Sequence, residues 1–249
     1  KADKLDDAQQ ALEQAKKQGV DGEQLNLLEA QLSPTTRKSP NTNTKPPKEL
    51  LTNLLKLYQN RQYGEAEKLA VKITQDFPEH EFAWKLLGAV LGATGRKTAA
   101  LDVNQKVVAL SPLDAGAHNN LGLILRELGR LDEAAASCHQ AIALKPDLAE
   151  AHSNLGNTLK ELGRFDDAEA SYQRALALKP GFAEVHYNLA NTCKALGRLE
   201  NAAASYNQAI ALKPDYAEAH SNLGITLQAM GRLDEATVSY QKAIALKPD

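Results

Sequence analysis

One segment of 34 residues returns along most of this chain, and its period constrains the fold more than any other feature. The unit 149–182 reads AEAHSNLGNTLKELGRFDDAEASYQRALALKPGF, and it returns as 183–216 and 217–249. Upstream it reads similarly in 115–148 and more loosely in 81–114. Six prolines keep the same spacing: Pro78, Pro112, Pro146, Pro180, Pro214 and Pro248. Such a period is typical of proteins built from one supersecondary motif stacked many times.

Every unit contains two stretches with the apolar spacing of an amphipathic helix. In the unit 149–182, Leu155 and Leu159 stand four residues apart in the first stretch. Ala168 and Tyr172 stand four apart in the second. Residues at this spacing share one face of a helix. Each unit is therefore predicted to be a pair of helices.

Turn-forming residues separate the predicted helices. Gly163 follows the first helix of its unit, where a glycine can adopt the left-handed conformation that closes a helix. Pro180 ends the second helix because its ring cannot continue one. The Asp147 to Glu150 spacing resembles a capping box for the next first helix. These signals predict short connections and antiparallel neighbours.

Small residues recur where the two helices of a unit must approach each other. Gly156 in the first helix is predicted to face Ala168 in the second. The same pairing recurs as Gly88 with Ala100, Gly122 with Ala134, Ala190 with Ala202, and Gly224 with Ala236. A larger side chain would push the helix axes apart, which makes these positions sensitive to overpacking.

The units resemble the tetratricopeptide repeat (TPR) family. The pattern of that family is a large residue, Leu-Gly, an apolar residue, a small Ala, an aromatic residue, another Ala and Pro. In the unit 149–182 these positions are occupied, in order, by His152, Leu155, Gly156, Leu159, Ala168, Tyr172, Ala175 and Pro180. The resemblance covers about 200 residues. It implies an all-α fold, a right-handed superhelical TPR solenoid of antiparallel helix pairs.

The chain divides into three parts. Residues 47–249 are predicted to form a TPR array of about six repeats, with bounds 47–80 (divergent), 81–114, 115–148, 149–182, 183–216 and 217–249. Residues 33–46 are rich in Pro, Ser and Thr and are predicted to be an extended linker. Residues 1–32 carry two helical patterns, which fit either a separate helical pair or a degenerate half-repeat.

Charge and cysteine content narrow the classes of partner. The net charge is −2 and the pI is about 6.4, so no basic bias points to nucleic acid or to a membrane surface. No apolar run approaches the ~20 residues that span a bilayer. Cys138 and Cys193 lie in non-adjacent units at different repeat positions, and we expect them to be unbridged. This indicates a reducing compartment, the cytoplasm.

No arrangement of residues predicts catalysis. Ser, His and Asp recur with the period, so their spacing follows the repeat and not a reaction. Four histidines, His118, His152, His186 and His220, form a column. Equivalent residues of adjacent repeats lie on the order of 10 Å apart, while zinc needs its nitrogens at ~2.0–2.1 Å. We therefore assign the column a packing role and predict no metal, no cofactor and no enzymatic activity.

Asparagines form a second column, two residues before each Leu-Gly site: Asn120, Asn154, Asn188 and Asn222, extended by Asn157 and Asn191. In a TPR superhelix the first helices line the concave surface, so this column is predicted to follow the groove. An Asn amide both donates and accepts, and can hold a peptide backbone without reading its side chains. The alternative interpretation is a solvated polar face. Because Asn is a poor helix former, we favour the ligand interpretation.

The Asn column makes the repeats similar to the TPR domains of O-linked N-acetylglucosamine transferases and Spindly-like proteins, and of bacterial TPR-sulfotransferase-like proteins. In the transferases the column holds the acceptor polypeptide, and this implication reaches only Asn120, Asn154, Asn188 and Asn222. The predicted function is a protein-protein interaction module that binds an extended polypeptide, as the substrate-recruiting region of a larger transferase. The alternative is a free-standing scaffold.

A second TPR binding mode, the carboxylate clamp for chaperone C-termini, fits poorly. Lys85 and Asn120 could begin it, but Ala89, Glu150 and Asn154 break the pattern. At the other end, the unit 217–249 has no polar capping helix after it. We expect the natural protein to continue there, and we expect self-association of the fragment through this uncapped repeat.

Overall fold

The computed structural model of the chain describes residues 45–247. The helical pair expected in 1–32, and nearly all of the linker expected in 33–46, lie outside the described residues. The described part contains twelve helices and no strand. They are α3 (Lys48–Gln59), α4 (Tyr63–Asp76), α5 (Glu81–Ala93), α6 (Lys97–Leu110), α7 (Ala115–Glu127), α8 (Leu131–Leu144), α9 (Ala149–Glu161), α10 (Phe165–Leu178), α11 (Ala183–Ala195), α12 (Leu199–Leu212), α13 (Ala217–Ala229) and α14 (Leu233–Leu246).

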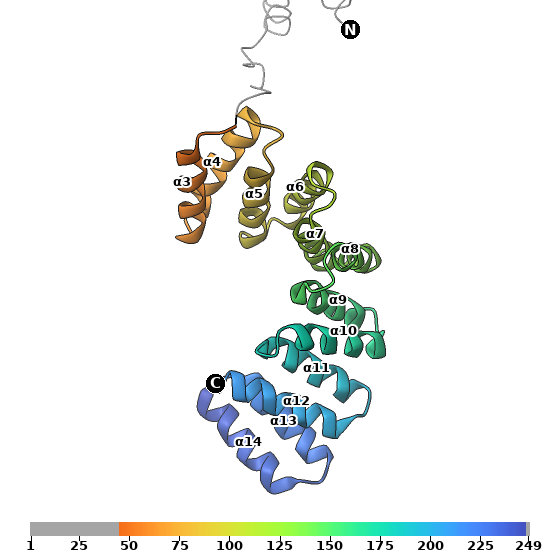
Figure 1. Cartoon of the computed structure of the whole chain (residues 1–249). Helices are drawn as coiled ribbons and strands as arrows, with labels where there is room; N and C mark the ends of the chain where they lie inside the picture. Colours follow the sequence, from red (N-terminus) through yellow and green to blue (C-terminus); the bar gives the residue numbers. More distant parts are fainter. Residues whose placement is uncertain (1–44, 248–249) are drawn as a thin grey trace, which may run out of the picture.

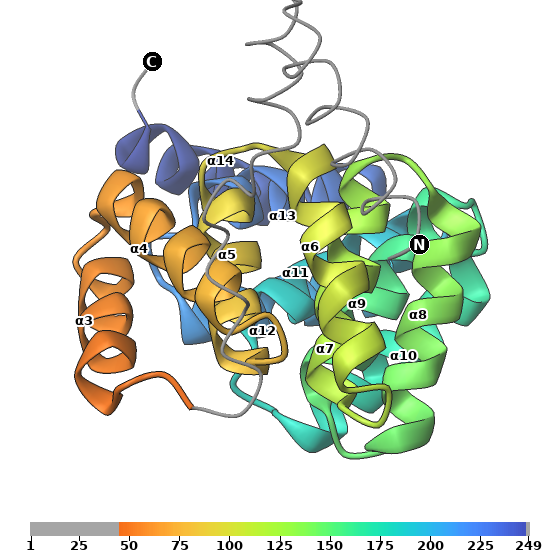
Figure 2. The same cartoon turned by 90° about the horizontal axis from the view of Figure 1, so that it is seen from above.

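Consecutive helices pack as antiparallel pairs that stack along an arc (Figure 1). Each odd-numbered helix packs on the helix that follows it, and from α5 onward also on the second helix of the preceding pair. Odd-numbered helices also approach one another directly, α3 with α5, α7 with α9 and α9 with α11. The pairs wind into a superhelix (Figure 2). The expected TPR solenoid is confirmed, and the first helices line its inner side.

The Gly-Arg connections close the first helices as the sequence predicts. Gly163 has a φ of +75°. Its N–H donates to the Lys160 carbonyl at 3.0 Å, and the Arg164 N–H donates to the Leu159 carbonyl at 2.9 Å. These two bonds form a Schellman motif, which satisfies carbonyls at the end of α9. In the first pair Arg61 occupies the equivalent position at a φ of +57°, a conformation that disfavours a side chain.

The capping-box interpretation is wrong. Helix α9 begins after Leu148, whose side chain cannot cap it, and Asp147 makes no capping bond there. The real capping position lies one residue later in the unit. Asp114 occupies it before α7, where its Oδ1 accepts from the Gly116 N–H at 2.8 Å. Spacing to the following Glu suggested the box, but the start of the helix decides which residue caps it.

The histidines of the column form hydrogen bonds to the turns between successive helix pairs. The Nε2 of His118, His152, His186 and His220 lies 2.9–3.1 Å from the carbonyl oxygen of Pro112, Pro146, Pro180 and Pro214, respectively. Trp84 makes the same contact, donating from Nε1 to the Pro78 carbonyl at 2.8 Å. A carbonyl only accepts, so each histidine carries its proton on Nε2 in this contact. The shared spacing of His and Pro therefore has a structural cause.

The core lies between the helices of each pair and continues from pair to pair. The largest fully buried side chains are Tyr172 and Tyr206, on the second helices α10 and α12. A Cβ added to Gly156 would lie 2.6 Å from the Tyr172 ring, so any side chain there would require the ring to shift. The predicted small-residue position is therefore genuine, but the nearest obstacle is the tyrosine ring four residues beyond Ala168.

Candidate functional site

The asparagine column lies on the odd-numbered helices, along the inner side of the superhelix. Asn120 on α7 is exposed, whereas Asn154 on α9, Asn188 on α11 and Asn222 on α13 are half-buried. Solvent exposure alone does not explain why asparagine recurs at this position, because three of the four residues are partly enclosed by neighbouring side chains. Their contacts show what encloses them.

Each half-buried asparagine donates at least one hydrogen bond to the first helix of the preceding pair. Asn154 Nδ2 donates to Asn119 Oδ1 at 2.9 Å. Asn188 Nδ2 donates to Asn157 Oδ1 at 3.0 Å. Asn222 Nδ2 donates to the Tyr187 hydroxyl at 2.9 Å and lies 3.4 Å from Asn191 Oδ1. The amides therefore cross the interface between repeats, and each has a fixed orientation.

Asn157 and Asn191 have mainly an internal role. The Tyr172 hydroxyl donates to Asn157 Oδ1 at 2.7 Å, and the Tyr206 hydroxyl donates to Asn191 Oδ1 at 2.6 Å. Both tyrosines are fully buried, and a buried hydroxyl needs a hydrogen-bond partner. Each of these carbonyl oxygens also faces the amide of the next column member. Sequence reasoning placed both residues in the groove but missed their tyrosine partners.

The hydrogen bond between tyrosine and asparagine forms in the units 149–182 and 183–216, which contain both residues. One unit earlier, Leu123 and Cys138 replace Asn157 and Tyr172, so neither group needs the bond. One unit after Asn191, the equivalent position is occupied by Ile225. The Tyr240 hydroxyl there donates to Gln228 Oε1 at 2.9 Å instead. The network is therefore confined to the middle of the array, between α9 and α13.

Charged residues flank the column near the C-terminal ends of the first helices. Arg126 Nη1 lies 2.7 Å from Glu161 Oε1, an ion pair that crosses from α7 to α9. Lys160 is partly enclosed, and burial lowers its pKa. In the part of the chain that the structure describes, Lys160 has no salt-bridge partner. The middle of the inner surface thus carries both signs of charge and predicts no preference for acidic or basic ligands.

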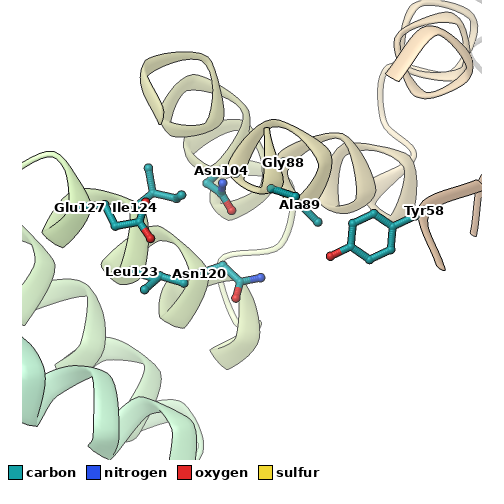
Figure 3. A pocket seen from close by; sticks show the side chains of 10 residues that line it. Tyr58, Gly88, Ala89, Asn104, Asn120, Leu123, Ile124 and Glu127 are labelled. Carbon is teal, nitrogen blue, oxygen red and sulfur yellow. The ribbon is translucent and has the colours of Figure 1, made fainter. Parts of the chain in front are cut away.

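A pocket of about 330 Å³ opens on the inner side between α3, α5 and α7 (Figure 3). Its lining is Tyr58, Gly88, Ala89, Gly92, Ala93, Asn104, Asn120, Leu123, Ile124 and Glu127. Sequence reasoning missed it. The sequence does contain a signal for the pocket. In the unit 81–114 the small residues Ala89 and Gly92 stand where the next unit has the larger Leu123 and Arg126.

Neither cysteine is bridged, and both are buried. Burial raises the pKa of the Cys138 thiol to about 12, and burial with the adjacent Glu169 carboxylate raises that of Cys193 to about 11. Over residues 45–247, no cluster of three or more His, Cys, Asp or Glu is placed to hold a metal. No helix in that range has the length and apolar character to cross a membrane.

Similarity to solved structures covers most of the array. The pilus biogenesis factor PilW has a TM-score of 0.75 and 22% identity, over 81% of this chain and 93% of PilW. A MamA structure has a TM-score of 0.61 and 25% identity, over 65% and 95%. YrrB, described as a TPR protein with an unusual peptide-binding site, has a TM-score of 0.59 and 21% identity, over 72% and 93%. No curated protein matches the sequence significantly.

Family models match the array without a gap. Models described as tetratricopeptide repeat match residues 54–115, 113–181, 161–204 and 217–249, and one described as TPR repeat matches 190–231. Together with the helix pairs, the left-handed glycines and the small residues under the tyrosine rings, these matches identify the chain as a member of the tetratricopeptide repeat family.

Proposed function

We propose that this chain is a protein-interaction module that binds an extended polypeptide along the inner side of its superhelix. One observation carries the proposal: the amides of Asn154, Asn188 and Asn222 are pre-oriented and only partly used. Each donates to the preceding repeat, and Asn222 donates there twice. Within residues 45–247 their Oδ1 atoms accept no hydrogen bond, and Asn154 and Asn188 each retain a second N–H. An acceptor therefore remains on all three amides, and a donor remains on two of them.

The spacing of these amides suits a peptide backbone. Adjacent repeats lie on the order of 10 Å apart, and an extended chain rises about 3.3 Å per residue. One amide thus meets about every third peptide residue, and it can pair with backbone N–H and C=O groups of any sequence. Similarity to YrrB, which is described as having a peptide-binding site, supports this function at the level of the fold.

Two further elements of the proposal have narrower support. Delivery of the bound polypeptide to a transferase domain rests on the resemblance of the repeats alone. Self-association, which would suit a scaffold, rests on exposed apolar residues of α14, where Leu233, Val238 and Ile244 are 62%, 59% and 63% exposed. In the preceding pair, Ile210, the equivalent of Ile244, packs against the core. A cytoplasmic location rests on the two unbridged cysteines.

The test is a binding screen on an array of unrelated peptides about ten residues long, which would span about three repeats. The column variant changes Asn120, Asn154, Asn188 and Asn222 to Ala. The matched control changes four exposed residues with the same spacing on the second helices to Ala: His139, Gln173, Asn207 and Gln241. We expect the column variant to lose binding and the control to keep it.

Stability must be separated from binding, because three column residues bridge repeats. Each lost bridge should cost about 0.5–1.5 kcal/mol, so circular dichroism and a melting curve accompany the screen. Asn120→Ala provides a second variant, because Asn120 is exposed and makes no hydrogen bond to residues 45–247. Peptide binding that survives in a folded column variant would contradict the proposal and direct attention to the outer face.

A further inference from the structure

We propose that the pocket between α3, α5 and α7 binds one long basic side chain, lysine or arginine, of the polypeptide held in the groove. This inference rests on the proposed peptide binding and adds specificity to it. The Asn column contacts backbone and tolerates any sequence. The pocket would select one residue and fix the register of the bound peptide.

The pocket is produced by several small residues on one helix. At the position of Gly92 the following units carry Arg126, Lys160 and Lys194. At the position of Ala89 stands Leu123 in the next unit. Long side chains at these places would project over the inner side of α5, and their absence leaves the hollow open.

A buried polar side chain is directed into this hollow. Asn104 on α6 is only 7% exposed, and its Nδ2 donates to the Ala100 carbonyl of its own helix at 2.8 Å. Its Oδ1 accepts no hydrogen bond from residues 45–247. In Figure 3 the Asn104 side chain points into the space between Gly88 and Asn120. Asn104 is thus a nearly buried side chain whose carbonyl oxygen still lacks a donor, and this favours a ligand that brings one.

The other groups that line the pocket favour a cation. Glu127 supplies a carboxylate, whose Oε2 lies 3.5 Å from Lys97 Nζ and whose other oxygen has no partner among the described residues. Asn120 adds an amide, and the Tyr58 hydroxyl lies at the mouth. No lysine or arginine is part of the lining. Acceptors and one negative charge around an ammonium or guanidinium would form charge-assisted hydrogen bonds.

The walls and the size suit the stem of such a side chain. Ala89, Ala93, Leu123 and Ile124 present apolar surface. The aliphatic portion of lysine or arginine packs well on apolar surface while its head remains hydrogen-bonded. The volume of about 330 Å³ is close to the lower bound for ligand pockets and accommodates one side chain. Asn120 belongs both to this pocket and to the column, which joins the pocket to the proposed peptide path.

The experiment uses libraries of N-acetylated, C-amidated decapeptides with one central position fixed as Lys, Arg, norleucine or Glu and all other positions randomised. Binding is followed by fluorescence polarisation. We expect the Lys and Arg libraries to bind about tenfold more tightly than the norleucine and Glu libraries. Glu127→Gln should reduce the preference for Lys and Arg over norleucine.

Gly92→Lys should abolish the preference by filling the pocket with the side chain that other repeats carry. A Cβ at Gly92 would meet only Ile124 Cδ1, at an ordinary 3.7 Å, so the variant is compatible with folding. Gly64→Lys, at an exposed helical glycine with no atom within 4 Å of its added Cβ, is the matched control and should keep the preference.

The outcomes separate this inference from the proposed function. If all four libraries bind wild type equally, if norleucine is preferred, or if the preference persists in Gly92→Lys, the basic-pocket inference is wrong while groove binding stands. If no library binds, the proposed function itself fails. A preference for Lys and Arg that Gly92→Lys removes and Gly64→Lys retains would establish the pocket as the specificity site.

Discussion

The inner surface is built differently in two adjacent regions of the same array. In the middle, from α9 to α12, Tyr172 and Tyr206 fill the space beneath the first helices and their hydroxyls bind Asn157 and Asn191. In the region from α5 to α8, Asn104 and Cys138 occupy the tyrosine positions, and Ala89 and Leu123 the asparagine positions. The first region is closed by a polar network, and the second contains a pocket.

A repeat can therefore keep its fold while its interior contacts change. The helix pairs have the same lengths and the same closing glycines in both regions. A buried tyrosine hydroxyl needs an acceptor. Asn157 and Asn191 supply it for Tyr172 and Tyr206, and Gln228 supplies it for Tyr240. Once the tyrosine is replaced by a smaller residue, the asparagine position is released to carry Leu or Ala. The predictions below test how far the two regions differ.

The largest expected effect on stability comes from removing a large buried side chain. Tyr172→Ala removes a fully buried ring and should lower the free energy of unfolding by about 3–5 kcal/mol. Cys138→Ala, at the equivalent position, removes only a sulfur atom and should cost about 1 kcal/mol. Urea unfolding followed by circular dichroism compares them. Equal losses would contradict the view that the tyrosine fills the closed region.

A smaller loss is expected from overpacking. In Gly156→Leu the new side chain begins where a Cβ lies 2.6 Å from the Tyr172 ring, and we expect a loss of about 1–3 kcal/mol. One methyl is tolerated at this position, since Ala190 stands there opposite Tyr206, so leucine is the informative substitution. Gly92→Leu is the control, because it extends into the pocket. An unchanged melting temperature in Gly156→Leu would refute the packing described here.

The polar network should contribute less to the free energy of unfolding than the buried tyrosine ring does. Asn157→Leu leaves the Tyr172 hydroxyl and the Asn188 amide without an acceptor, and we expect a loss of up to about 2 kcal/mol. Tyr172→Phe in the Asn157→Leu background removes one of these unpaired groups and should recover part of it. A double-mutant cycle gives the coupling energy. Additive losses would mean that the bond is unimportant.

A gain is expected in the open region. Gly92 lies inside α5 and its added Cβ meets only Ile124, so Gly92→Ala should raise the free energy of unfolding by about 0.5–1 kcal/mol. The cause is the lower conformational entropy of the unfolded chain. Thermal unfolding measures the gain. A destabilised Gly92→Ala would show that the pocket floor is closely packed, unlike the hollow proposed here.

The smallest effect concerns pH. Burial raises the pKa of Cys138 from 9.0 to about 12, so the native state holds this proton more tightly than the unfolded state. The resulting stability is complete below pH 9 and is lost as the pH rises toward 12. At pH 9 the loss should be about 0.4 kcal/mol for this thiol. Unfolding at pH 7 and pH 9 should show a smaller difference in Cys138→Ala than in wild type, and an identical difference would exclude this origin.

The repeat and its helix pairs could be predicted from the sequence alone. The spacing of prolines and the Gly-Arg pairs predicted helix pairs with left-handed glycines, because these features depend on local backbone preferences that recur every 34 residues. It also predicted the asparagine column and the small residue at Gly156, since both follow from which residues share a helical face. It misplaced one cap, at Asp147, because helix starts depend on a single residue.

The contacts of the asparagine column and the position of the pocket depend on how the helices pack in space. The partners of Asn188 and Asn222 stand 31 or 35 residues away, on the preceding helix pair, and no local pattern specifies the distance between them. The pocket depends on three helices meeting over Gly92, and a glycine in one helix predicts a hollow only once its neighbours are placed. Periodicity fixes the element, while packing between elements fixes which atoms meet.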